Sequence, residues 1–208
     1  MIAALPAILR AVKTVTISSV VDALEALPTD RISVESVAEI LGAGALDEAS
    51  LRPFIGFCDD HYARRLVHRS DRFDVMVLSW NPGQRTPVHN HSGQLGWVRL
   101  VRGVIEETHF ACSNPTALED TSCLDIDVDG RGHGVGLART SQALIANVGA
   151  VAAVDRVRAI HQLGNPTQGS SPDRTVTLHV YSLPHDSCMC FDPEEQTCWR
   201  RELRFDAS

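Results

Sequence analysis

The sequence predicts a mainly β protein, a β-sandwich or jelly-roll barrel with short helices packed outside it. Two observations support this prediction. Residues 1 to about 60 carry apolar residues at helical spacing, whereas short alternating segments recur between turn-forming clusters from Tyr62 onward. Short strands at such regular spacing are typical of sandwiches and closed barrels. We therefore expect a single domain over residues 1–208, with a helical part at 1–60 and a β-barrel at 61–208.

The N-terminal part contains three candidate helices. They are 16–27 (TISSVVDALEAL), 33–41 (SVESVAEIL) and 47–57 (DEASLRPFIGF). The second opens with Ser33, and the third follows a Gly-Ala-Gly break and places acidic residues in its first turn, where they favour a helix. Arg10 and Lys13 interrupt the apolar residues of 1–19, so we expect an uncleaved amphipathic helix there and not a signal peptide.

The strands are predicted from alternation of apolar and polar residues. The candidates are 72–80 (RFDVMVLSW), 95–110 (LGWVRLVRGVIEETHF), 143–149 (ALIANVG), 155–163 (DRVRAIHQL) and 175–183 (TVTLHVYSL). The first has Phe73, Val75 and Val77 on one face, and the second divides into two strands at Arg102–Gly103. Clusters of Gly, Pro, Asn and Asp predict connecting loops at 81–87, 129–136 and 164–174.

The composition excludes several classes of function. The chain is 44% hydrophobic and 22% charged, as expected of one globular core, and its net charge of -7 argues against nucleic acid or an anionic membrane as partner. No apolar stretch reaches the roughly 20 residues that span a bilayer. The cysteines lack the spacing of a disulfide framework; they are Cys58, Cys112, Cys123, Cys188, Cys190 and Cys198. Reduced thiols in the cytoplasm are the better interpretation.

His89 and His91 form the first candidate metal motif. Residues i and i+2 of a strand point to the same face, roughly 6–7 Å apart, so two imidazoles there can meet one metal ion about 2 Å from each nitrogen. The alternative is that one histidine faces solvent or satisfies a polar group of the core, and the pair alone does not decide. His161, on a later strand, is the best third ligand, although His179 also alternates to one strand face.

The remaining histidines fall near loops or predicted element ends, where surface histidines are common. They are His61, His68, His109, His133 and His185. We expect no functional role for them.

The histidine motif resembles a known family. Gly83-x5-His89-x-His91-x4-Gly96-x6-Gly103 resembles the first cupin motif, and His161-x3-Asn165 resembles the end of the second. The usual cupin glutamate is replaced by Gly96, as in thiol dioxygenases. The segments HYARRLV, RFDVMVLSW, RLVRGVIEETHF and VTLHVYSLPHDSCMCFD are similar to cysteine dioxygenase segments in the same order. The resemblance covers roughly residues 60 to 192 and implies a cupin jelly roll.

The resemblance implies a mononuclear Fe(II) site and a reaction. His89, His91 and His161 would hold the iron through neutral imidazoles, leaving its positive charge available to a thiolate substrate. The implied enzyme oxidises L-cysteine with O2 to cysteine sulfinic acid, with no reducing co-substrate, and the family default is a monomer. Three histidines also bind zinc well, so iron is implied by the family and not by the ligands alone.

The resemblance also assigns substrate and catalytic residues. Arg64 matches the arginine that binds the substrate carboxylate, a role that suits its planar fork. His179 and Tyr181 match the family's pair whose hydroxyl points at the bound thiolate and oxygen. Tyr62 would line the entrance, and Cys188 matches a pocket cysteine. Thr177 could extend the His179–Tyr181 pair on the same strand face, and Trp80 would pack below the pocket.

Departures from the family pattern leave alternatives open. Gly96 stands where animal enzymes have the cysteine that crosslinks to the catalytic tyrosine, so no such bond can form with Tyr181. Leu183–Pro184 replaces a Pro-Pro pair, which leaves its cis or trans state undecided. Arg64 with Cys188 favours L-cysteine over 3-mercaptopropionate. The alternative from another class of function is a non-catalytic cupin that binds a metal and acts as a sensor. Cys190 and Cys198 are expected to be spectators.

Overall fold

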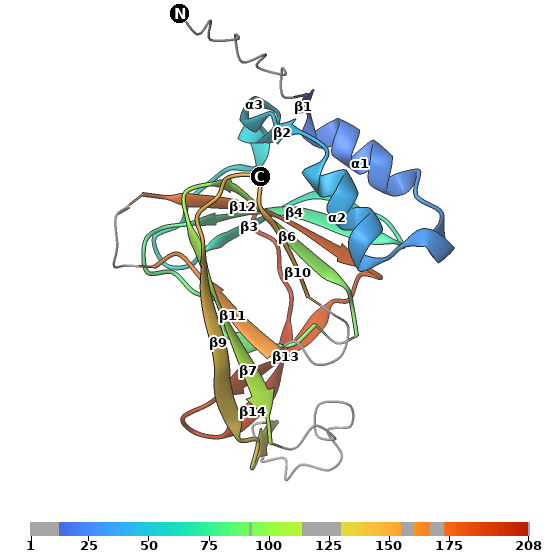
Figure 1. The fold of residues 1–208 in the computed structure, drawn as a ribbon. Coiled ribbons are helices and arrows are strands. Elements are labelled where there is room, and N and C mark those ends of the chain that lie inside the picture. The colour runs from blue at the N-terminus through green and yellow to red at the C-terminus, as the bar shows by residue number, and fades with distance from the viewer. Residues whose placement is uncertain (1–12, 92, 114–129, 155–159, 167–172, 208) are drawn as a thin grey trace, which may run out of the picture.

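A computed structural model describes residues 13–91, 93–113, 130–154, 160–166 and 173–207 (Figure 1). Two antiparallel sheets pack against each other, and the helices lie outside one of them. The predicted jelly roll with external helices is therefore confirmed. Within the described residues, no helix is both long and apolar enough to span a membrane.

The two sheets differ in size and in role. The first contains, in spatial order, β10 (Val151–Val154), β6 (Gly96–Arg102), β12 (Thr175–Ser182), β4 (Phe73–Trp80) and β3 (Ala63–Arg69). The second contains β8 (Arg131–His133), β14 (Thr197–Glu202), β13 (Ser187–Asp192), β5 (Val88–His89), β11 (Ile160–Gly164), β7 (Ile105–Cys112) and β9 (Leu137–Ile145). The first sheet carries the helices, and the second carries two of the three predicted metal ligands.

Alternation along β4 separates the two faces of the first sheet. Phe73, Val75 and Val77 point outward into a core shared with the helices, as predicted, whereas Met76 and Leu78 point inward into a second core between the sheets. The same alternation in β12 sends Val176, Leu178 and Val180 outward. Its other residues therefore face the interior of the jelly roll.

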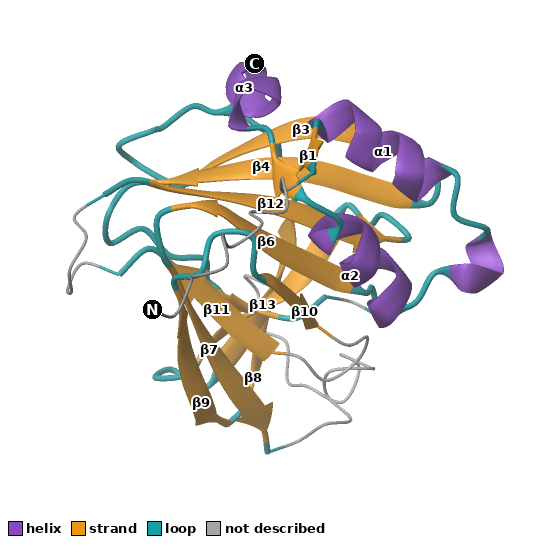
Figure 2. Ribbon diagram, turned by 45° about the horizontal axis from the view of Figure 1, so that its top comes forward, coloured by secondary structure: helices purple, strands orange, loops and turns teal. Residues whose placement is uncertain are grey.

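The helices form one layer over the outer face of the first sheet (Figure 2). They are α1 (Ile17–Glu25), η1 (Thr29–Arg31), α2 (Val34–Gly42), α3 (Glu48–Leu51) and η2 (Arg52–Phe54), with a parallel pair of short strands, β1 (Thr14–Val15) and β2 (Ala45–Leu46), beside them. Thr16 and Ser33 cap α1 and α2 by accepting hydrogen bonds from backbone N–H groups in the first turn. The predicted third helix is shorter than expected, because Pro53 in its sequence cannot donate a helical hydrogen bond.

Two side chains of β6 attach α2 to the sheet at both ends. Trp97 donates from Nε1 to the carbonyl oxygen of Val34 over 3.0 Å, at the start of the helix. Arg99 is buried and donates to the carbonyl oxygens of Leu41 and Gly44, at the other end. A cation at this end satisfies carbonyl groups that lack helical partners and complements the helix dipole.

Several predicted boundaries were wrong. The predicted loop 129–136 contains β8, the predicted strand 143–149 ends at Ile145, and β10, β13 and β14 were not predicted. The two glycines around His133 obscured β8, which is a strand because β14 pairs with it. Residues 1–12 and 155–159 lie outside the described residues. Most of the amphipathic helix expected within 1–19 and part of the predicted strand 155–163 therefore lie outside them as well.

We expect Leu41→Ala to lower the free energy of unfolding of the whole chain by about 2–5 kcal/mol, because Leu41 is fully buried between α2 and the sheet. Chemical denaturation followed by circular dichroism measures the effect. Glu39→Ala, on the exposed side of the same helix, is the control. If Leu41→Ala unfolded in two transitions, and the sheets unfolded at the same denaturant concentration as in the wild type, the prediction that residues 1–208 form a single domain would be contradicted.

Candidate metal centre and substrate pocket

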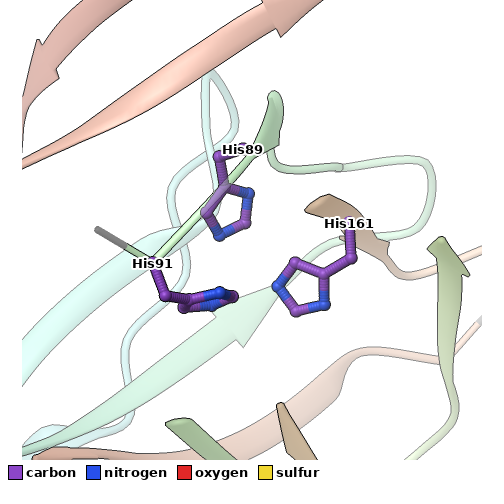
Figure 3. A group of neighbouring side chains, drawn as sticks. All are labelled: His89, His91 and His161. Atoms are coloured by element: carbon purple, nitrogen blue, oxygen red, sulfur yellow. The ribbon is translucent and has the colours of Figure 1, made fainter. Parts of the chain in front are cut away.

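Three histidines converge in the structure, two of them on neighbouring strands and one on the segment that follows the first strand (Figure 3). His89 ends β5, and His161 on β11 is its direct partner in the antiparallel register. His91 is buried but lies two residues beyond the end of β5. The prediction that His89 and His91 share one strand face was therefore wrong, because His91 is not part of a strand. The strand pairing thus brings together two motifs that are distant in the sequence.

The donor atoms of the three imidazoles suit one metal ion. They lie within 4.8 Å of one another, so small side-chain movements bring all three to the usual metal–nitrogen distance of about 2 Å. His89 Nδ1 donates to the carbonyl oxygen of Pro87 over 3.0 Å, and His161 Nδ1 donates to Glu107 Oε1 over 2.7 Å. Each ring therefore directs Nε2 toward the cluster, and His161 Nε2 is buried with no hydrogen-bond partner among the described residues.

Burial keeps these ligands in the protonation state that a metal requires. It lowers the pKa of His89 to about 4 and holds the pKa of His161 well below its usual value. Neutral imidazoles present a lone pair at physiological pH and suit iron, zinc and other transition metals. The cluster can therefore hold a metal ion, and its nitrogen donors do not select iron over zinc.

A chain of hydrogen bonds follows the inward face of β12. Trp80 Nε1 donates to Thr177 Oγ1 over 2.9 Å, Thr177 Oγ1 lies 2.8 Å from His179 Nε2, and His179 Nδ1 lies 3.3 Å from the Tyr181 hydroxyl. The Tyr181 ring stacks beside His91, with 5.7 Å between the ring centroids. The chain thus connects a fully buried indole to the edge of the histidine cluster.

The predicted substrate residues line one pocket. Its walls include Tyr62, Arg64, His89, His91, His179, Tyr181 and Cys188, while His161 completes the metal cluster. Arg64 on β3 has no carboxylate partner among the described residues; its Nη2 lies 3.4 Å from Met76 Sδ, and its Nε is buried without a partner. Tyr62 stacks on Trp80, with 4.6 Å between the ring centroids.

Gly96 lies directly against Tyr181. A Cβ atom added at Gly96 would stand 3.0 Å from Tyr181 Cε1 and 2.9 Å from Val154 Cγ2. Glycine leaves this space to the phenol ring and supplies no sulfur for a thioether. The Leu183–Pro184 bond, which the sequence left undecided, is trans.

Several residues near the site could not be predicted from the sequence, and His185, for which no role was expected, also lines the pocket. Glu107 orients His161, and His109 lies inside β7 with its ring 5.9 Å from that of His161, not near an element end as expected. Cys190 and Arg201 also line the pocket, although Cys190 was expected to be a spectator. Only strand pairing brings these residues to the site, and a single sequence does not show which strands pair.

The jelly roll and its interior histidine cluster define a cupin with a candidate metal centre. A family model described as cysteine dioxygenase type I matches residues 7–194, and the chain belongs to this family. The match includes the N-terminal helices, so the resemblance extends further than residues 60 to 192.

Individual proteins show more distant similarity. Cysteine dioxygenase type 1 of Homo sapiens is 24% identical over 164 residues, which cover 78% of this chain and 72% of the human protein. The Rattus norvegicus protein is 25% identical over the same share of each chain. Among solved structures, TT1209 from Thermus thermophilus matches with a TM-score of 0.42 and 20% identity, covering 64% of this chain and 93% of TT1209.

We expect Glu107→Ala to weaken metal binding about 10- to 100-fold, because His161 loses the acceptor that orients its ring. Titration of the metal-free protein with Fe(II) under anaerobic conditions, and separately with Zn(II), measures the affinity. His161→Ala should weaken binding further, and His133→Ala, an exposed histidine on β8, is the control. Equal affinities in all four proteins would show that the metal binds elsewhere.

Proposed function

We propose that this chain is an iron-dependent thiol dioxygenase that oxidises L-cysteine with O2 to cysteine sulfinic acid. The observation that carries this proposal is one pocket, beside a cluster of three histidines that could hold a metal ion, that also contains a phenol and an arginine without a carboxylate partner among the described residues. In the reaction, both oxygen atoms of O2 join the thiolate sulfur, so that R–S⁻ and O2 give R–SO2⁻. Fe(II) held by His89, His91 and His161 would supply the redox chemistry.

Arg64 binds and orients the substrate in this proposal. Its guanidinium lines the pocket, and its positive charge and planar donors suit a substrate carboxylate. Anchoring the carboxylate fixes the position of the thiol carbon chain relative to the histidine cluster, and such orientation lowers the barrier of a reaction between bound groups. Tyr62 and Cys188 border the same space and limit the size of the substrate.

Tyr181 donates a hydrogen bond toward the reacting atoms. Burial raises the pKa of Tyr181 to about 12, so its phenol keeps its proton at neutral pH. Trp80 can only donate, so Thr177 accepts from it; Thr177 then donates to His179, and His179 donates to Tyr181. In this assignment the Tyr181 proton is left to point into the pocket, and Thr177 and His179 are positioning residues.

The combination of Arg64 and Cys188 favours L-cysteine over 3-mercaptopropionate, which remains the alternative substrate. A non-catalytic sensor is the alternative from another class, and it would bind metal without turning over a thiol. Such a sensor needs neither Arg64 nor the hydrogen-bond chain that ends at Tyr181.

We also propose that the protein acts as a cytoplasmic monomer. This proposal is in keeping with the resemblance and with the free cysteines among the described residues.

We expect the Fe(II)-loaded protein to consume O2 with L-cysteine and to form the sulfinate, measured with an oxygen electrode and mass spectrometry. Arg64→Gln should lower kcat/KM for L-cysteine about 10- to 150-fold, mainly through KM, because charged hydrogen bonds to the carboxylate are lost. Arg65→Gln changes the neighbouring residue, which does not line the pocket, and is the control.

Parallel assays with 3-mercaptopropionate distinguish the alternatives. A higher kcat/KM for 3-mercaptopropionate than for L-cysteine would keep the iron site but contradict the assigned substrate. Iron binding without O2 uptake from either thiol would contradict the enzyme and favour the sensor.

A further inference from the structure

The substrate pocket continues into a wider cleft. The inner pocket beside the histidines has a volume of ≈ 50 Å³, space for on the order of four water molecules, whereas the outer cleft has a volume of ≈ 590 Å³. Tyr62, Arg64 and Arg201 line both spaces. A substrate group too large for the inner pocket therefore extends past these three side chains.

Arg201 reaches this position because of the β13–β14 register. Cys188 and Arg201 are direct antiparallel partners, as are Cys190 and Trp199, so all four side chains share one face of the sheet. The two cysteines line the inner pocket and Trp199 lines the outer cleft. Arg201 stands at the junction between them.

Neither arginine of the inner pocket has a carboxylate partner among the described residues. Asp74, the carboxylate that lines this pocket, is already held by two hydrogen bonds of 2.7 Å from Arg69. Arg204 in the outer cleft is paired with Glu202. Asp206 in the outer cleft accepts hydrogen bonds from His61 and from the backbone N–H of Arg64, not from either guanidinium. The guanidinium groups of Arg64 and Arg201 therefore have no direct carboxylate partner among the described residues, at the junction where a substrate would bind.

The charge of Arg201 acts on the interior of the pocket. A hydrogen bond from the Cys190 thiol lowers the pKa of Cys188 despite its burial, and the positive charges of Arg64 and Arg201 add to this effect. An anionic group of a ligand at the same junction is stabilised in the same way.

A substrate with one carboxylate compensates only part of this charge. In the proposed reaction the thiolate would interact with the metal ion and the carboxylate with Arg64, which leaves Arg201 unmatched. We propose that Arg201 binds a second anionic group, so that the site accepts thiols with two anionic groups, such as thiol dicarboxylates, in addition to L-cysteine. The inference rests on the proposed thiol dioxygenase function.

The test compares two thiols that differ by a single carboxylate, 3-mercaptopropionate and 2-mercaptosuccinate. Their Kd values for the metal-loaded protein are measured without oxygen by calorimetry, and their kcat/KM values by O2 uptake. We expect Arg201→Gln to lower the preference for 2-mercaptosuccinate over 3-mercaptopropionate at least about tenfold in both measurements, and Arg201→Lys to restore part of it. Arg204→Gln removes a cleft cation that is already paired and should leave this preference unchanged.

The outcomes separate this inference from the proposed function. If L-cysteine is turned over, but the wild type and Arg201→Gln show the same preference for 2-mercaptosuccinate over 3-mercaptopropionate, the role of Arg201 is overturned and the proposed function stands. A loss of preference in Arg204→Gln equal to that in Arg201→Gln would also overturn it, because the effect would then be general attraction by the cleft. Binding that depends on Arg201, without turnover of any thiol, would support the anion site and overturn the dioxygenase.

Discussion

The register of β12 is the constraint on which the site depends. Val176 and Leu178 are fully buried against the helical layer, and this forces Thr177, His179 and Tyr181 to face the interior. A slip of one residue would turn every side chain of the strand to the opposite face and expose its apolar residues to the pocket. None of the described helices contributes a residue to the lining of the substrate pocket, yet by burying one face of β12 they specify the position of the phenol.

Much of the fold and part of the candidate site could be predicted from local patterns in the sequence. Alternation in 72–80 and 175–183 predicted both central strands, because each buries one apolar face against the helices. Ser33 predicted the start of α2, since a hydroxyl before an apolar helical pattern caps it. By contrast, the residues Cys188–Phe191 of β13 are apolar without interruption, so its sequence shows no alternation of apolar and polar residues.

The remaining site residues depend on which strands become neighbours. Glu107 meets His161 because β7 pairs with β11, and Arg201 meets the pocket because β14 pairs with β13. Neither pairing leaves a signal within its own segment. The net charge of -7 also conceals the local character of the pocket, where two arginines lack acidic partners among the described residues. The composition therefore argues against a polyanionic partner but says little about a small anionic substrate.

The short strand β5 has a thermodynamic consequence. It consists of Val88–His89 and is held between β11 and β13, so the ligands of the candidate metal centre meet only when both sheet neighbours have folded. In the unfolded chain these segments are far apart, and an ion that binds the folded cluster shifts the folding equilibrium by mass action. Each tenfold excess of free metal over its Kd adds about 1.4 kcal/mol to the stability of the folded state. The metal centre would thus act as a reversible crosslink that closes the loop between the two histidine motifs, and metal supply would regulate protein stability as well as activity.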